Sequence, residues 1–242
     1  MRDMLILAIE TTGPLASCAL WDGREMKQLI NTTQYSHLEE IAPMTQRLMR
    51  DNSVSPADID AIAVSRGPGS FTGVRIGMAT AKALAQVWNK PVIEVPTLAS
   101  FAYGSYEWMM SPSRLLICPI FDARRSQVYA GVYRMGSKTP LIEDAAYGME
   151  ELMEKIRALS SDWDGIVFFG DATAPYKDSL VFCAMPYETA RGDDLYQMAS
   201  SVAKLGAELF AEGVLSDCYS CKPEYLRLAE AERKLAEKNG RA

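Results

Sequence analysis

The segment that most constrains the fold is residues 61–88, in which a short apolar strand runs into a glycine-rich turn and then into a helix. Residues 61–64 are apolar throughout, as expected for a strand that is covered on both faces of a sheet. The helix after the turn is apolar almost all round, whereas a surface helix usually carries an apolar stripe only about 100° wide. The segment therefore predicts an α/β protein in which this helix buries more than one face.

Small residues recur at every fourth position along one side of this helix, with larger apolar residues beside them: Gly73, Gly77, Ala81 and Ala85, flanked by Val74, Met78 and Trp88. Small side chains at this spacing let another helix approach closely along the shared ridge. Either both faces of the helix pack inside the core of the protein itself, or the ridge binds a partner protein. The sequence pattern leaves both interpretations open.

The glycine-rich turn, residues 66–73, fails the three sequence templates that would give it a known chemistry. A Walker loop needs a lysine directly after Gly73, and a dinucleotide fingerprint needs a glycine in place of Thr72. A hydrolase nucleophile elbow needs a glycine in place of Pro68. Two interpretations remain: an anion site on free amides at the helix start, beside Arg75, or a purely structural turn.

The second half of the chain repeats the pattern of the first half. Residues 5–10 and residues 115–122 are each an apolar strand that ends in an acid and is followed by a turn into a second strand. Residues 60–66 and residues 164–170 also match in strand pattern and position. Two βββαβα units are the simplest interpretation, and each predicts a mixed sheet with an antiparallel edge, covered by helices.

The repeat divides the chain into two similar lobes and a tail. We expect an N-terminal lobe that carries the partner-binding helices, a C-terminal lobe whose last helix packs back toward the N-terminal lobe, and a charged tail, at residues 1–107, 108–228 and 229–242.

Composition narrows the cellular compartment and the function class. No segment reaches the ~18 uncharged apolar residues of a membrane span, and residues 1–3 lead into a strand rather than into a signal-peptide core. The five cysteines are scattered and odd in number, which argues against a disulfide framework, and Cys218 and Cys221 have metal or redox spacing without a second pair. A net charge of -6 argues against nucleic-acid binding by this chain alone. We expect a cytoplasmic protein that contacts no membrane.

Histidine content excludes one class of metal site. His37 is the only histidine, so the chain cannot form a site that needs two histidine ligands. We expect His37 on the surface, in the first turn of a helix, and we expect no metal site.

Duplicated βββαβα units, with an acid at the end of the first strand of each, resemble the superfamily of actin, sugar kinases and heat-shock chaperones, which is built from ribonuclease-H-like lobes. The resemblance implies a cleft between the lobes for ATP, with hairpin residues at the phosphates and an acidic side chain on Mg²⁺. The positions that correspond to a nucleotide or anion site are Glu10, Thr11, Thr12, Gly67, Gly69, Ser70 and Asp122.

Two departures from the superfamily pattern put strong nucleotide binding in doubt. Glu10 is one methylene longer than the usual aspartate, and Mg²⁺ tolerates little change in ligand geometry. No clear double-glycine adenosine loop stands at Gly170 and Asp171. We therefore expect a vestigial site, with no tightly bound cofactor and at most weak nucleotide binding, or binding only within a complex.

Four segments together resemble one bacterial family: ILAIETT at 6–12, RGPGSFTGVRIG at 66–77, FDARR at 121–125 and PEYLR at 223–227. The family is the glycoprotease-like group of dimerisation subunits of the tRNA threonylcarbamoyladenosine synthesis complex, and the likeness runs from Met4 to Arg227. It implies a subunit with no catalytic residues that pairs with and stabilises a paralogous metal-dependent transferase. That paralogue moves threonylcarbamoyl to an adenosine beside the tRNA anticodon and holds its metal with histidines, so the single His37 fits the subunit that lacks this chemistry.

The same resemblance implies where partners bind. The family pairs through two N-terminal helices, which map onto residues 36–51 and 72–88. This places the partner interface on Leu38, Ile41, Thr45, Leu48, Gly73, Val74, Gly77, Met78, Ala81, Ala85 and Trp88. The implied partners are the transferase paralogue, a small ATPase of the same pathway and, for the chain alone, a second copy, with no strong direct tRNA binding.

Two alternatives from other function classes stay open at the level of sequence. The first is an ATP-dependent small-molecule kinase of the same superfamily, which Glu10 and Asp122 at the hairpin positions would favour. The second is a peptidase, for which Ser70 is the only candidate nucleophile.

Overall fold

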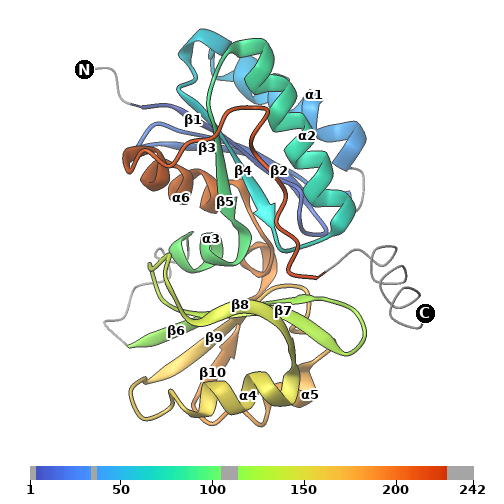
Figure 1. The fold of residues 1–242 in the computed structure, drawn as a ribbon, viewed down its shortest axis with the longest axis vertical. Coiled ribbons are helices and arrows are strands. Elements are labelled where there is room, and N and C mark those ends of the chain that lie inside the picture. Colours follow the sequence, from blue (N-terminus) through green and yellow to red (C-terminus); the bar gives the residue numbers. More distant parts are fainter. Residues whose placement is uncertain (1–3, 34–36, 105–113, 228–242) are drawn as a thin grey trace, which may run out of the picture.

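The computed structural model describes residues 4–33, 37–104 and 114–227, which form two lobes, each built on a five-stranded mixed sheet (Figure 1). The expected lobe boundary at residues 107 and 108 and the expected charged tail at 229–242 lie outside the described residues. Within the described ranges, no helix has the length and apolar character needed to cross a membrane.

The N-terminal sheet has the strand order β3-β2-β1-β4-β5. Its strands are β1 (Ile6–Glu10), β2 (Ala16–Trp21), β3 (Met26–Asn31), β4 (Ala61–Gly67) and β5 (Val92–Pro96). The first three strands form an antiparallel meander, and β4 and β5 continue the sheet parallel to β1. Every residue of β1 is buried, because helices cover both faces of the sheet, as the apolar run in the sequence predicts.

The C-terminal sheet has the order β10-β9-β6-β7-β8, which is the same arrangement with β6 in the place of β1. Its strands are β6 (Leu115–Asp122), β7 (Gln127–Arg134), β8 (Pro140–Gly148), β9 (Gly165–Phe169) and β10 (Tyr187–Thr189). The predicted duplication of ribonuclease-H-like lobes is confirmed. Each sheet adds a fifth, parallel strand to the expected βββαβα unit, and β10 is only 3 residues long, too short for an apolar run to mark it.

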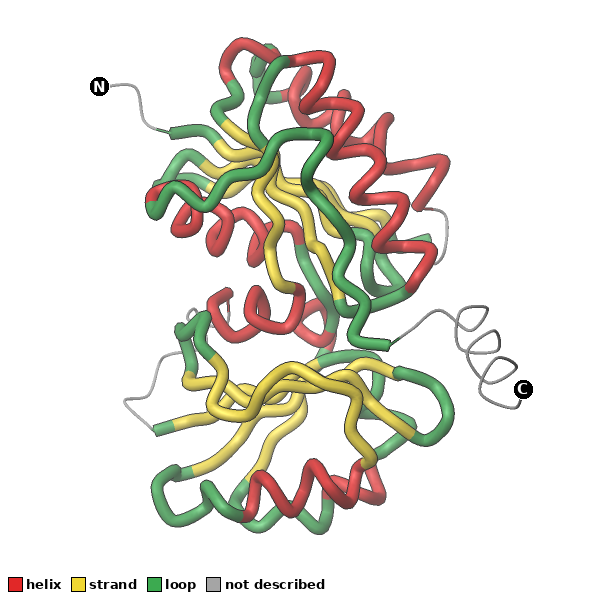
Figure 2. The backbone as a smooth tube through the Cα atoms, in the orientation of Figure 1, coloured by secondary structure: helices red, strands yellow, loops and turns green. Residues whose placement is uncertain are grey.

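The helices lie in three layers, two on the outside of the molecule and one between the sheets (Figure 2). The outer layers are α1 (His37–Asp51) with α2 (Phe71–Trp88), and α4 (Met149–Arg157) with α5 (Lys177–Leu180); the middle layer is α3 (Thr97–Gly104) with α6 (Ala199–Ala211). Two short 3₁₀ helices are η1 (Pro56–Asp58) and η3 (Gly192–Leu195).

Helix α6 follows the C-terminal sheet in sequence but packs on the inner face of the N-terminal sheet, against β1, β2 and β4. Gly206 allows this close approach, because a Cβ atom there would lie 2.7 Å from the Cβ atom of Ala63 in β4. The chain therefore crosses between the lobes more than once, and the N-terminal lobe is incomplete without the last helix.

Helix α3 joins the two lobes through a shared apolar core. The ring of Phe101 lies 5.4 Å from the ring of Phe121 and 5.8 Å from that of Phe169, both in the C-terminal lobe. The amide of Gly136, after β7, donates a hydrogen bond to the carbonyl of Ala102 (2.8 Å). One apolar cluster thus contains residues of both sheets, and the lobes are held together on the side of α3.

Replacing Phe101 by alanine tests this shared core. Removing a buried aromatic ring that contacts both lobes should lower the free energy of unfolding by about 3–5 kcal/mol. Urea denaturation measures the change. Phe182→Ala is the matched control, because the ring of Phe182 is 68% exposed on the C-terminal lobe, and its loss should change stability by less than about 0.5 kcal/mol. Equal effects of the two substitutions would contradict a core that spans the lobes.

Candidate functional site

A cleft of about 370 Å³ lies between the lobes, at the place where the superfamily resemblance puts ATP. It is lined by the turns after β1, β4 and β6, at residues 12–14, 69–72 and 121–124, together with Tyr129, Asp171 and Gln197. Of the seven residues predicted for a nucleotide or anion site, the structure brings Thr12, Gly69, Ser70 and Asp122 together at this cleft.

The glycine-rich turn packs tightly against the turn after β1. A Cβ atom at Gly69 would lie 2.6 Å from the Cβ atom of Thr12, and a Cβ atom at Gly73 would collide with the carbonyl oxygen of Thr11. The Thr11 hydroxyl donates a hydrogen bond to the carbonyl of Gly73 (2.7 Å). Gly69 and Gly73 therefore allow the glycine-rich turn to pack directly against the turn after β1, and a larger residue at either position would prevent this contact.

Three amides of the glycine-rich turn donate hydrogen bonds within the chain. The amide of Ser70 donates to the carbonyl of Thr12 (2.8 Å), and the amide of Gly73 donates to the hydroxyl of Ser70 (3.3 Å), which caps α2. The amide of Gly67 donates to the hydroxyl of Thr97 (3.1 Å). Of the two interpretations left open by the sequence, these hydrogen bonds favour a structural turn.

Glu10, one of the residues predicted for a vestigial nucleotide or anion site, does not line the cleft. Its side chain is fully buried, and its two carboxylate oxygens accept hydrogen bonds from the amide of Thr12 and the hydroxyl of Ser65. Burial raises the pKa of the Glu10 carboxyl, and these hydrogen bonds oppose that shift. Glu10 joins β1 to β4, which corrects its assignment to a ligand site.

Gly67 also lies away from the cleft. Its φ is +115°, and a Cβ atom there would lie 2.5 Å from the carbonyl oxygen of Glu224. Gly67 thus makes room for the C-terminal part of the chain rather than for a phosphate.

Two carboxylates, those of Asp122 and Asp171, line the cleft. The amide of Asp122 donates to Oδ1 of Asp171 (3.1 Å), and the Asp122 carboxylate lies 3.5 Å from the guanidinium of Arg124. Thr12 Oγ1 and Gln197 Oε1 are buried, belong to lining residues and have no hydrogen-bond partner. Phosphates need donors and cations, so this set of atoms is a poor match for a triphosphate. The sequence analysis did not predict Asp171 as a site residue. It lies in the turn after β9 and lines the cleft, and its position at the end of a buried strand could have marked it.

His37 is buried rather than exposed, which corrects the expectation from its position at the start of a helix. Its Nε2 atom lies 2.9 Å from the carbonyl oxygen of Gly13. The side chain therefore joins α1 to the turn after β1. Among the residues that the structure describes, no group of three histidine, cysteine or acidic side chains is placed to hold a metal ion.

Most residues predicted for the partner interface are covered by the chain itself. The buried ones are Ile41, Thr45, Leu48, Gly73, Val74, Gly77, Met78, Ala81 and Ala85, whereas Leu38 is 74% exposed and Trp88 is half-buried. The small-residue ridge faces the sheet: a Cβ atom at Gly77 would lie 3.5 Å from Cγ2 of Val64 in β4. The nine buried residues are not surface contacts in this structure, which corrects their placement at an interface.

A different face of α2 points outward. We call it the outer α2 face; its exposed members are Ala79, Ala83 and Val87, with half-buried Ile76, Thr80 and Leu84 beside them. Next to it, a groove of about 290 Å³ runs between α1 and α2 and is lined by residues such as Ala42, Met49 and Trp88. Periodicity could have found this second stripe, because it repeats with the same spacing of three and four residues.

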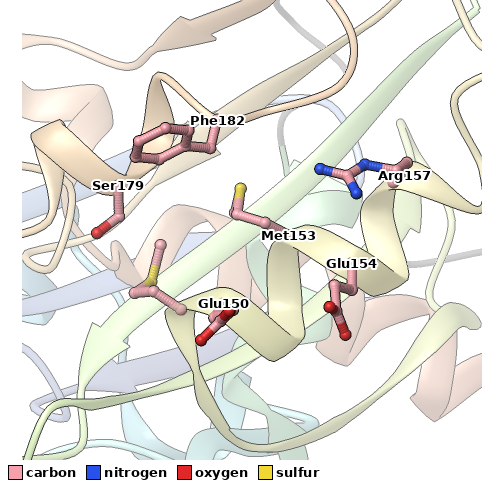
Figure 3. Close-up of a pocket in the computed structure, with 7 residues that line it drawn as sticks. Glu150, Met153, Glu154, Arg157, Ser179 and Phe182 are labelled. Carbon is pink, nitrogen blue, oxygen red and sulfur yellow. The ribbon is translucent and has the colours of Figure 1, made fainter.

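A separate groove of about 430 Å³ lies on the C-terminal lobe, between α4 and the segment around α5 (Figure 3). Met153 and Phe182 supply its apolar lining, and Glu150, Glu154 and Arg157 of α4 supply its charged groups. The sequence analysis did not single out these residues.

Two similar ribonuclease-H-like α/β lobes with a cleft between them define the class of this protein, and this is the fold class that the sequence predicts. A family model described as TsaD, tRNA N6-adenosine threonylcarbamoyltransferase, matches residues 31–235. The solved structure of YeaZ from Pseudomonas aeruginosa superposes with a TM-score of 0.74 at 24% identity, covering 92% of this chain and 99% of that one.

Curated relatives narrow the family further. The chain is 31% identical to tRNA threonylcarbamoyladenosine biosynthesis protein TsaB of Escherichia coli (strain K12), over 96% of this chain and 98% of the relative. It is 33% identical to the protein of the same name from Bacillus subtilis (strain 168), over 97% of this chain and 99% of the relative. The chain belongs to the TsaB family.

The packing of the glycine-rich turn predicts a strong effect of Gly73→Ala. The added methyl group would collide with the Thr11 backbone, which cannot move aside as a flexible side chain could, so we expect a clear loss of thermal stability. Gly148→Ala is the control, because a Cβ atom there meets nothing within 4 Å. Differential scanning calorimetry compares the two melting temperatures. If Gly73→Ala were as mild as Gly148→Ala, the tight packing would be refuted.

Asp144 on β8 predicts a pH dependence of stability. Burial raises the pKa of its carboxyl to about 6 from the ordinary 3.8, although the Tyr133 hydroxyl donates a hydrogen bond to it. The folded chain then holds this proton more tightly than the unfolded chain, so the stability that Asp144 contributes is present at about pH 4 and is lost as the pH rises to about 6.

Asp144→Asn removes that dependence and keeps an acceptor for Tyr133. The melting temperature of the variant, relative to that of the unchanged protein, should therefore increase as the pH rises from about 4 to 7. A pH series of thermal melts measures the difference, with Asp178→Asn at an exposed position of α5 as control. A difference that stays constant with pH would count against the raised pKa.

Proposed function

We propose that the chain is a non-catalytic subunit of cytoplasmic tRNA threonylcarbamoyladenosine biosynthesis, which pairs with the threonylcarbamoyltransferase paralogue through the outer α2 face and the α1–α2 groove. Membership of the TsaB family supports the pathway. The observation that carries the pairing is an apolar helix face that no other part of the described chain covers.

The outer α2 face has the composition of an interface core. Its exposed positions Ala79, Ala83 and Val87 are uncharged, and Val87 is 80% exposed. Small side chains every fourth residue let a second helix lie close, and exposed apolar surface of this kind marks protein interfaces. The adjoining groove between α1 and α2 offers room for a side chain of the partner helix.

The partner that fits this face is a protein with a similar helix pair. A family model described by the name of the transferase matches this chain over residues 31–235, a range that contains both α1 and α2. Two related chains can pair through equivalent helices about a pseudo-twofold axis, and two copies of one chain can do the same. We therefore propose the transferase paralogue as the partner, and a homodimer through the same helices when that partner is absent.

The chemistry of the cleft supports a subunit that does not turn over substrate itself. Glu10 is buried and bonded, the amides of Ser70 and Gly73 are occupied, and the carboxylates of Asp122 and Asp171 line the cleft. These features favour weak nucleotide binding at most and make the kinase alternative a poor fit. The peptidase alternative also fits poorly, because the hydroxyl of Ser70 caps α2 and His37 is engaged at Gly13.

One further partner completes the proposal. A small ATPase of the same pathway acts on the paired complex, as the family resemblance implies. With a net charge of -6, this chain leaves most of the contact with tRNA to those partners, because phosphate binding needs clustered lysine and arginine.

Ala83→Glu and Val87→Glu test the pairing face. A carboxylate placed in an apolar helix contact loses its hydration without gaining a partner, so we expect affinity for the transferase to fall by tenfold or more, on the order of 1.4 kcal/mol. Light scattering of mixtures, together with calorimetric titration, measures the loss.

Val181→Glu is the matched control, because Val181 is a valine 60% exposed on the C-terminal lobe. It should leave pairing intact. Unchanged affinity in both α2 variants would show that the outer α2 face is not part of the interface. If the Val181 variant also lost affinity for the transferase, the cause would be a general effect of added charge.

A further inference from the structure

Residues 214–227 follow α6 and form an extended segment, which we call the strap (Figure 1). The family resemblance includes its end, PEYLR at 223–227, but neither the proposed pairing nor the cleft chemistry gives these residues a role. Figure 1 shows the strap passing over the N-terminal lobe and ending between the two lobes.

The first half of the strap is anchored to the edge of the N-terminal sheet. Ser216 and Val92 exchange two backbone hydrogen bonds of 2.8 Å each. The carboxylate of Glu94 in β5 then accepts hydrogen bonds from the Ser216 hydroxyl and from the amide of Lys222 (2.6 Å). Cys221 is fully buried against the α1–α2 side of the core. Residues 216–222 are therefore a fixed part of the N-terminal lobe.

The second half of the strap is bonded to the turn between β4 and α2. The amide of Glu224 donates to the carbonyl of Arg66 (2.7 Å), and the side chains of the same two residues form an ion pair of 2.7 Å. The ring of Tyr225 lies 5.2 Å from that of Phe71, and its hydroxyl accepts a hydrogen bond from Arg75 Nε (2.9 Å). Phe71 is one of the residues that line the cleft.

Arg227 bonds the strap to the C-terminal lobe. Its Nη1 atom donates a hydrogen bond to the carbonyl of Ala123 (2.7 Å) and lies 3.5 Å from the carbonyl of Arg124. Both carbonyls belong to the turn between β6 and β7, on the opposite wall of the cleft. Hydrogen bonds from a charged donor are stronger than those between neutral groups. The strap thus connects the two walls of the cleft within three residues.

The connection lies on the opposite side of the interlobe space from the packed core around α3. On one side of the interlobe space, Phe101 of α3 packs against Phe121 and Phe169. In Figure 1, α3 lies to the left between the sheets, and the strap comes down on the right. Two lobes joined along one side by a packed core can open by a hinge motion, unless a second contact holds the other side.

We propose that the strap is an interlobe clamp, which sets the width of the cleft by tying the β4–α2 turn to the β6–β7 turn through Glu224, Tyr225 and Arg227. A ligand bound between two lobes can draw them together. Here the chain's own C-terminal segment makes that connection, so the lobes are held at one separation without a ligand. The inference does not depend on the pairing proposal, because it concerns contacts within one chain.

The test measures the separation of the lobes in the full chain. Spin labels on unnatural amino acids at Asp51, at the end of α1, and at Arg157, at the end of α4, report the distance without using the cysteines. Arg227→Ala should shift the distance distribution to longer values and broaden it. Lys222→Ala is the matched control, because Lys222 is an exposed residue of the same strap that lies before the crossing, and it should leave the distribution unchanged.

Hydrogen exchange followed by mass spectrometry gives a second readout. Loss of the Arg227 hydrogen bonds should speed exchange at the β6–β7 turn about tenfold, while α6 keeps its protection. If Arg227→Ala lowers global stability too far, Arg227→Lys, which retains the charge without the fork of donors, should give a smaller shift of the same sign. An unchanged distance distribution in a folded Arg227→Ala variant would overturn the clamp, even if exchange at the turn became faster.

Discussion

The structure depends on one backbone contact, the packing of the glycine-rich turn against the turn after β1. Gly69 and Gly73 bring the start of α2 against Thr11 and Thr12 so closely that no side chain fits between them. This contact sets the direction of α2, because it directs the small-residue ridge at β4 and leaves the opposite stripe of the helix at the surface. It also uses the amides and the hydroxyl that would otherwise face a ligand.

The first acid of the N-terminal lobe has a structural role inside the fold. Glu10 is bonded to Ser65 and to the turn after β1, and the carboxylates that line the cleft are those of Asp122 and Asp171. A buried carboxylate with both oxygens bonded stabilises the junction of two strands, but it has no free lone pair directed at a metal. The two sheets have the same strand order, but the acid that ends β1 is buried whereas Asp122, which ends β6, is exposed.

The lobes are not independent units, because the chain returns to the N-terminal lobe after completing the C-terminal sheet. Helix α6 covers the inner face of the first sheet, α3 packs between both sheets, and the strap runs back over the first lobe to the cleft. This arrangement gives the molecule an apolar cluster that both lobes share, with separate clusters under the outer helices of each lobe. A rigid scaffold lowers the entropy lost when its surface binds a partner.

The sequence by itself determined the α/β class, the duplication and the absence of known catalytic templates, because apolar periodicity and glycine spacing are local properties. Its prediction that α2 buries more than one face was wrong, because the buried residues of α2 form a single stripe against the sheet and the opposite stripe is exposed. Only the tertiary structure decided which stripe of α2 is outward, that Glu10 and His37 are buried, and that Arg227 reaches Ala123. Periodicity states which residues share a face, but the neighbour that covers each face is set by contacts between residues far apart in the chain, and these leave no periodic signal in the sequence.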